Sequence, residues 1–170
     1  MPVGIGGFRL RLQDVSTGVD LATEFETLNK AVAMFVEDRT EDDWGQLCPR
    51  ENWPVGGVIR HIAAGYVTAQ SWVNGFLQGK PIPIDQEAID RDNDAHAADF
   101  AASSRAITFD LLVTEGAVVG RLIRGLTDEQ LAIKHPVLSG RELTTAQLVK
   151  VLLRHTQGHF DNARSALGLA

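Results

Sequence analysis

Residues 143–168 read LTTAQLVKVLLRHTQGHFDNARSALG and carry the clearest structural signal in the chain. Thr144 is followed three residues later by Gln147, which is the spacing of a capping box at the start of a helix. We therefore predict a helix over about residues 145–167. The residues that share its inward face recur at helical spacing: Leu148, Leu152, His155, His159, Asn162 or Ala163, and Ala166.

Three other segments have helical periodicity, and residues that break helices separate them. The first spans about residues 18–39, with an apolar stripe formed by Leu21, Phe25, Leu28, Val32 and Phe35. The second begins at Pro54, whose missing N–H is tolerated at the first helical position, and runs to about Gln78. The third spans about residues 85–125, where we expect a polar first half and a packed second half from residue 100 onward.

The segments between these helices complete the fold prediction. We expect residues 40–54 to form a loop, and residues 132–143 to form either a brief extended hairpin or a loop. Four helices of roughly 20 residues, each about 30 Å long, can enclose one core. The prediction is an all-α protein, a four-helix bundle in a single domain of residues 1–170, with residues 1–17 as an N-terminal extension.

The composition limits the partners of the chain. Its formal net charge is −6 and its arginines are scattered, so we expect no nucleic-acid partner. The single cysteine, Cys48, excludes an intrachain disulfide and a cysteine-rich zinc site, which indicates a reducing compartment. Arginines interrupt the N-terminus where a signal peptide needs an apolar core, and no apolar run of about 18 residues occurs. We therefore expect a cytoplasmic protein without a membrane partner.

Three histidines form a candidate metal site. His155 and His159 are four residues apart, so their Cβ atoms lie about 5–6 Å apart on one helix face. His61 lies on the apolar stripe of the second segment. In a bundle, ligands come from facing helices, so these imidazoles can converge on one ion and leave a fourth position open. The alternative is that each is a core histidine bonded to a carbonyl. We expect His96 to face solvent and His135 to lie in a loop.

Three stretches resemble the DinB/YfiT-like superfamily over essentially the whole chain from about Asp20. NWPVGGVIRHIAAGY at residues 52–66 is similar to its second-helix motif, with Trp53 before the helix and His61 eight residues later. RDNDAHAADF at residues 91–100 is similar to the Asn-bearing start of its long third helix, and residues 143–168 are similar to its last helix.

The resemblance implies a bundle with a long crossover between the second and third helices. It also implies a divalent metal, usually zinc or nickel, at the positions of His61, His155 and His159. Members are proposed to be thiol S-transferases that use bacillithiol, mycothiol or glutathione, and others are proposed to be hydrolases. The related mycothiol-dependent maleylpyruvate isomerases have a Glu where this chain has His155, so their activity does not carry over directly.

Two classes of function remain open. The first is a metal-dependent enzyme that acts on a small molecule: a thiol S-transferase with a small electrophile bound beside Trp53, or a hydrolase. The second is a metal-binding bundle without catalysis. A pocket next to the metal, lined by Trp53, Trp72 or Phe160, would favour the enzyme. Asn93, which matches the superfamily motif, is the best candidate for a catalytic side chain, ahead of Asp90, Asp94 and Glu115.

We also expect a homodimer. Members of the superfamily often pair through bundle faces. In this chain the large aromatic side chains Trp44, Trp72 and Phe76 are hard to place in a single core.

Overall fold

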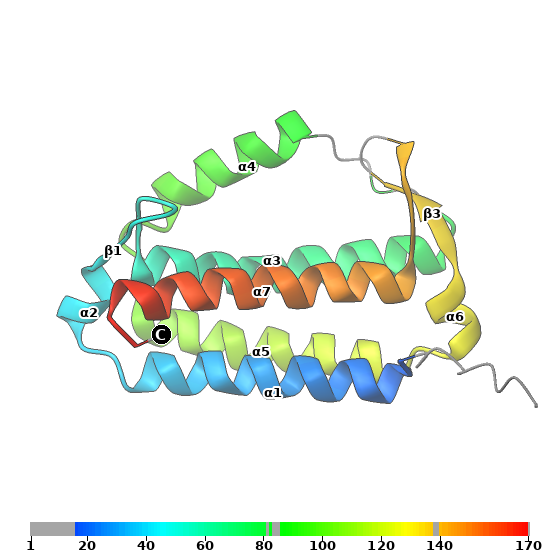
Figure 1. Cartoon of the computed structure of the whole chain (residues 1–170), viewed down its shortest axis with the longest axis horizontal. Coiled ribbons are helices and arrows are strands. Elements are labelled where there is room, and N and C mark those ends of the chain that lie inside the picture. The colour runs from blue at the N-terminus through cyan, green and yellow to red at the C-terminus, as the bar shows by residue number, and fades with distance from the viewer. Residues whose placement is uncertain (1–15, 81, 83–85, 138–139, 170) are drawn as a thin grey trace, which may run out of the picture.

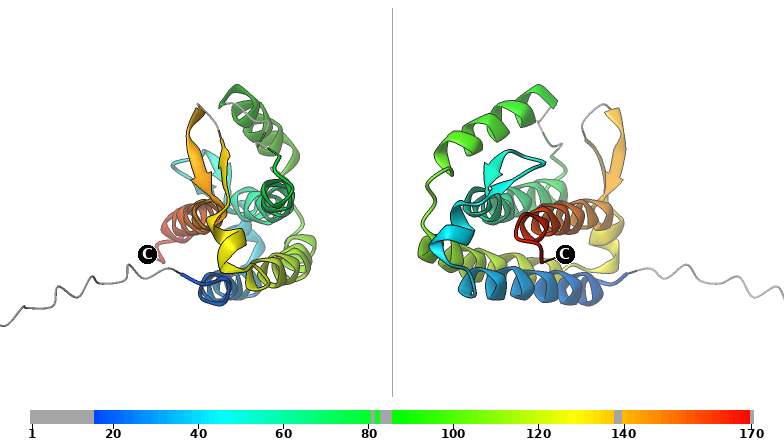
Figure 2. Two further views of the ribbon diagram at one scale, coloured as in Figure 1. Left: turned by 90° about the vertical axis from the view of Figure 1, so that its right-hand side faces the viewer. Right: turned by 60° about the vertical axis from the view of Figure 1, so that its left-hand side comes forward.

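Four long helices form the body of the molecule in the computed structural model, which describes residues 16–80, 82, 86–137 and 140–169 (Figure 1). The helices are α1 (Gly18–Glu37), α3 (Val55–Leu77), α5 (Arg105–Arg124) and α7 (Thr145–Ala166). Each packs against two neighbours, as the end-on views show (Figure 2). The predicted all-α class and four-helix bundle are confirmed. Most of the predicted N-terminal extension lies outside the described residues.

Local capping explains why these helices begin where they do. At α1, Thr17 and Asp20 form a capping box, and Thr144 and Gln147 form the predicted one at α7. Pro54 is the N-cap of α3 and not its first residue. The sequence therefore placed the start of α7 correctly and the start of α3 within one residue.

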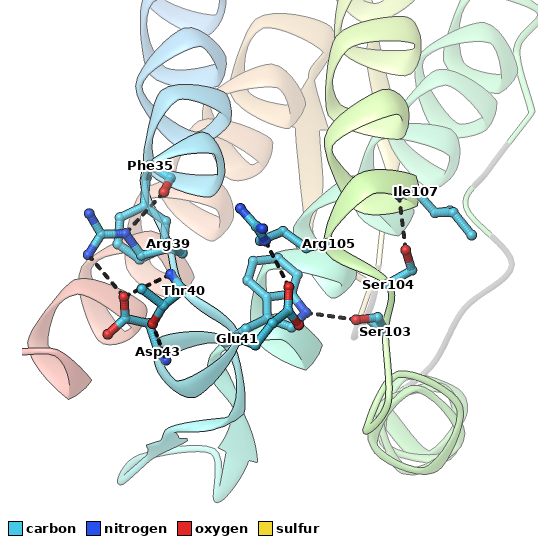
Figure 3. Close-up of polar contacts among 10 residues, drawn as sticks. Phe35, Arg39, Thr40, Glu41, Asp43, Ser103, Ser104, Arg105 and Ile107 are labelled. Atoms are coloured by element: carbon cyan, nitrogen blue, oxygen red, sulfur yellow. Dashed lines mark hydrogen bonds and ion pairs between the residues drawn. The ribbon is translucent and has the colours of Figure 1, made fainter.

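Residues 40–54 are more ordered than the predicted loop. They contain helix α2 (Glu41–Gly45) and a hairpin of β1 (Leu47–Cys48) and β2 (Trp53–Pro54). Thr40 and Asp43 cap α2, and Arg105 of α5 forms an ion pair with Glu41 at 3.3 Å (Figure 3). The indole Nε1 of buried Trp44 donates to the Ser103 carbonyl at 2.7 Å. The capping and the buried indole explain why the prediction of a loop was wrong.

The predicted third segment is two helices. Helix α4 (Gln86–Asp99) ends before residues 100–104, and Ser104 caps the separate helix α5. The polar sequence of α4 has no face that suits the core, and none of its described side chains is fully buried. Helix α4 instead lies across the outside of α3 and α7, within the long crossover that leads to α5 (Figures 1 and 2).

A second short helix and a hairpin join α5 to α7. Helix α6 (Asp128–Ala132) is capped by Thr127. Strands β3 (Lys134–Pro136) and β4 (Glu142–Thr144) pair antiparallel, so the hairpin alternative for residues 132–143 is confirmed.

A polar contact ties three of the long helices together inside the core. Tyr66 of α3, which is fully buried, donates its hydroxyl to Asn29 Oδ1 of α1 at 3.0 Å. Asn29 Nδ2 in turn donates to the Leu112 carbonyl of α5 at 3.0 Å. Trp44 and Phe76 are buried within this one chain and Trp72 is half-buried, so these aromatics do not require a partner subunit.

The homodimer therefore stays a prediction that rests on the resemblance. In the part of the chain that the structure describes, no helix is both long and apolar enough to cross a membrane.

Candidate metal centre

The packing of α3 against α7 brings His61, His155 and His159 together. One ring nitrogen from each lies within 4.8 Å of the other two. The Nε2 atoms of His61 and His155 are 3.0 Å apart, and the rings of His155 and His159 have centroids 4.5 Å apart. Three nitrogens bound to one tetrahedral ion at 2.0–2.1 Å would lie roughly 3.3 Å from one another. The spacing of the three imidazoles therefore fits a single ion.

Burial keeps His61 and His155 neutral, which is the form that binds a metal. Burial, followed by the nearby histidines, lowers the pKa of His61 to about 3. Burial, followed by the neighbouring His159, lowers the pKa of His155 to about 4. Because both values lie well below neutral pH, the lone pairs of these two rings are available to an ion at pH 7 without the loss of a proton.

A carboxylate that the sequence analysis missed orients His159. Glu51, in the turn between β1 and β2, has its Oε1 3.1 Å from His159 Nδ1, and the same oxygen accepts from Asn162 Nδ2 at 2.6 Å. A hydrogen bond from Nδ1–H to a carboxylate leaves the Nε2 lone pair for a metal, as is usual for metal-bound histidines. Glu51 Oε2 is buried and has no hydrogen-bond partner among the described residues.

The prediction that His96 faces solvent was wrong. Its Nδ1 is 2.9 Å from His61 Nδ1, and its ring stacks on Phe100 with centroids 4.6 Å apart. Helix α4 runs back along α3 (Figure 1), which puts His96 of this polar segment against the buried His61. Burial lowers the pKa of His96. Periodicity within α4 does not reveal where the chain folds back, so this contact was not predictable from the sequence.

The other candidates divide between the site and the rest of the fold. Asn93 lines a cavity beside the histidines, together with Asp92, which the sequence analysis did not select. Glu115 accepts from Gln70 Nε2 at 2.8 Å. His135 packs on the Phe76 ring, and Cys48 is fully buried with its pKa raised to about 11 by burial and by the charge of Glu51.

A cavity of about 300 Å³ adjoins the histidines, a volume at the lower end for small-molecule sites. It lies between α3, α4, α5 and α7. The residues that line it are mainly apolar: His61, Gly65, Thr68, Ala69, Gln70, Trp72, Val73, Ile89, Asp92, Asn93, His96, Val119, Leu122, Ile123, Leu148, Val149, Val151, Leu152 and His155.

Of the three aromatic residues that the sequence analysis placed beside the site, only Trp72 is in this lining. Trp53 instead sets its ring against His61, with centroids 5.4 Å apart. Phe160 packs against Phe35.

The fold and the histidine cluster together define the protein as a helical bundle with a candidate metal centre. Sequence comparison shows the family to which the chain belongs. The family model of the DinB superfamily matches residues 24–161, and the chain belongs to that superfamily. A search of the curated proteins gave no match.

A solved structure shares the fold. It is YfiT from Bacillus subtilis, described as a probable metal-dependent hydrolase with an unusual four-helix bundle topology. The two chains are 17% identical and superpose with a TM-score of 0.72 over 99% of this chain and 97% of that one. At this identity the likeness shows the shared architecture, which confirms the long crossover.

The lowered pKa values predict that the metal-free protein loses stability in acid. Below about pH 6.5 the unfolded chain protonates His61 and His155, whereas the folded chain does not until about pH 3 and pH 4. Below about pH 6.5 the unfolded state therefore binds more protons than the folded state, so the stabilising contribution of the two neutral histidines is fully present only above about pH 6.5. It falls with pH by at most about 1.4 kcal/mol per pH unit for each group.

Urea unfolding of chelator-treated protein between pH 7 and pH 4.5 measures this slope. His155→Gln should reduce it, while His135→Gln, in the β3–β4 hairpin, serves as the matched control. An unchanged slope in His155→Gln would show that His155 is not buried neutral.

Proposed function

We propose that this protein is a divalent-metal-dependent enzyme that acts on a small molecule, with His61, His155 and His159 as the ligands. The observation that carries the proposal is the convergence of three imidazoles, two of which, those of His61 and His155, line a largely apolar cavity. A structural metal site is closed by four protein ligands, whereas three ligands with one open position are typical of catalysis. Zinc and nickel are the metals that the resemblance favours.

The residues of the chain fit such an ion. His61 and His155 are neutral, and Glu51 supplies the carboxylate that directs His159. If His61 binds through Nε2, its Nδ1–H donates to His96 Nδ1, so His96 orients His61 as Glu51 orients His159. When bound, the ion supplies a Lewis acid that lowers the pKa of a small acid, such as a thiol or water, at its open position.

Within this class we propose transfer of an external thiol to a small electrophile. The chain has one cysteine, and Cys48 is buried with a raised pKa, so the protein itself has no reactive thiolate to offer at this site. A low-molecular-weight thiol would lose its proton to solvent, and its sulfur would then form a bond to an electrophilic carbon held in the cavity. The bond from that carbon to its leaving group would break, and the leaving group would depart with the electron pair. We place that carbon on the side of Trp72, because Trp53 does not line the cavity.

Hydrolysis is the second candidate, and two observations favour it. The solved structure with the same fold is described as a probable metal-dependent hydrolase. In this chain, Asp92, Asn93 and His96 of α4 line the cavity near His61, where an imidazole or carboxylate can accept a proton from an attacking water. The cavity itself argues against a metal-binding role without catalysis, since such a role needs no space for a substrate.

Metal content tests the ligand set. Protein purified without a His-tag should carry about one equivalent of a divalent metal by elemental analysis. His155→Ala and His159→Ala should each lose most of it, because each removes one of three ligands, while His135→Ala should keep it. If both ligand variants retain the metal content of the parent, the assignment is wrong.

Removal of the Glu51 charge should weaken the metal site without removing a ligand. We expect Glu51→Gln to lower metal affinity by about 10–100-fold, the usual effect of losing the partner of a metal-bound histidine. Competition with a chromophoric chelator measures this affinity. Glu24→Gln, at an exposed position of α1, is the matched control. Equal affinities of Glu51→Gln and the parent would contradict the orienting role.

A cobalt-substituted form distinguishes thiol transfer from hydrolysis. A sulfur ligand adds a charge-transfer band to cobalt that oxygen and nitrogen ligands do not. We expect glutathione, mycothiol or bacillithiol to produce this band, and we expect His61→Ala to abolish it with the helical content unchanged by circular dichroism. If none of the three thiols changes the spectrum, hydrolysis becomes the better proposal.

A further inference from the structure

The cavity beside the histidines has a polar end and a hydrocarbon end. Its lining runs along α3 from His61 to Val73, and along α7 in the opposite direction from His155 to Leu148 (Figure 1). At a rise of 1.5 Å per residue, the stretch of α3 between His61 and Val73 is roughly 18 Å long. The imidazoles of His61 and His155 therefore lie at one end of an elongated space, and mainly apolar side chains surround the other end.

The roof of the cavity follows the same gradient. Helix α4 contributes His96 next to His61, then Asp92 and Asn93, and finally Ile89, which is farthest along the helix from His96. The side chains around the far end are thus mainly apolar, and the amide of Gln70, the polar exception near Val73, donates to Glu115 Oε2 at 2.8 Å. A ligand that fills the space meets imidazoles at its head and hydrocarbon along its tail.

The charges of the walls exclude a second anionic group. Among the described residues that line the cavity there is no lysine or arginine, and the one carboxylate is Asp92. A carboxylate or phosphate at the tail of a ligand would lose its water without gaining a cationic partner. Burial of an unpaired charge is strongly unfavourable, and Asp92 would repel the anion as well.

We propose that the substrate is a hydrocarbon-tailed molecule with one polar, reacting group at its head, and that dicarboxylates and phosphorylated compounds are poor substrates. This inference rests on the proposed function for the identity of the reacting end. The tail contacts Val73 and Leu148, and the head faces His61 and His155.

Binding of matched ligands to the protein as purified tests the inference. The indole N–H signal of Trp72, assigned with Trp72→Phe, reports on ligands in the cavity by NMR. We expect affinity to rise about fourfold per methylene from butanoate to hexanoate. We expect adipate, which is hexanoate with a second carboxylate, to bind at least tenfold more weakly than hexanoate. Equal binding of adipate and hexanoate, or no dependence on chain length, would overturn the proposal.

Variants on two faces of α3 locate the tail. Ala69 lines the cavity and is 8% exposed, whereas Val67, two residues earlier, is 53% exposed and outside the lining. We expect Ala69→Phe to weaken hexanoate binding at least tenfold and Val67→Phe to change it less than twofold. If Ala69→Phe does not fold, Val151→Phe fills the cavity from α7 instead. Full affinity in a folded cavity-filling variant would contradict the proposal.

Chelator-treated protein separates this inference from the proposed function. In that form, 1-hexanol should still bind more tightly than 1-butanol and than 1,6-hexanediol, because the walls that contact the tail do not include the metal. If the protein as purified carries no metal but keeps this preference, the metal-dependent function fails and the substrate class stands. If metal is bound and adipate binds as tightly as hexanoate, the proposed substrate class fails and the metal-dependent function stands.

Discussion

The close approach of three imidazole rings between α3 and α7 is the constraint on which the candidate site depends. His61 is 7% exposed and its Nε2 lies 3.0 Å from that of His155, so protonation of either ring would place a charge in a buried space beside another polar nitrogen. The folded chain therefore holds both rings neutral. A bundle gains no stability from such a cluster, since aliphatic side chains would fill the same space without this restriction.

The short elements outside the bundle make sense as supports of this cluster. Asn52 has a left-handed backbone with φ of 58°, and its N–H donates to the Cys48 carbonyl at 2.9 Å, which closes the tight turn between β1 and β2. That turn holds Glu51 against His159, and β2 sets Trp53 against His61. The same hairpin then leads directly into α3. One local structure thus fixes the start of a helix, the orientation of one imidazole and the packing of another.

The sequence predicted the parts of this arrangement that depend on local pattern. The apolar repeat of α1, the capping box of α7 and the pair His155 and His159 each lie within a single helix, so local sequence spacing reveals them. Glu51 and His96 reach the site through a turn and a fold-back of the chain. Their contacts depend on tertiary structure, which spacing within a segment does not encode. The break between α4 and α5 was missed for the same reason.

Helix α4 connects the stability of the bundle to the chemistry of the site. It buries none of its described side chains fully, so the bundle gains little from its packing, yet it provides His96, Asp92 and Asn93 to the cavity. Its polar sequence is then explained by what it covers. An apolar α4 would pack more firmly on α3 and α7, but it would fill the cavity and remove the polar groups near His61. Weak packing at this helix is thus the expected consequence of keeping an open space beside the imidazoles of His61 and His155.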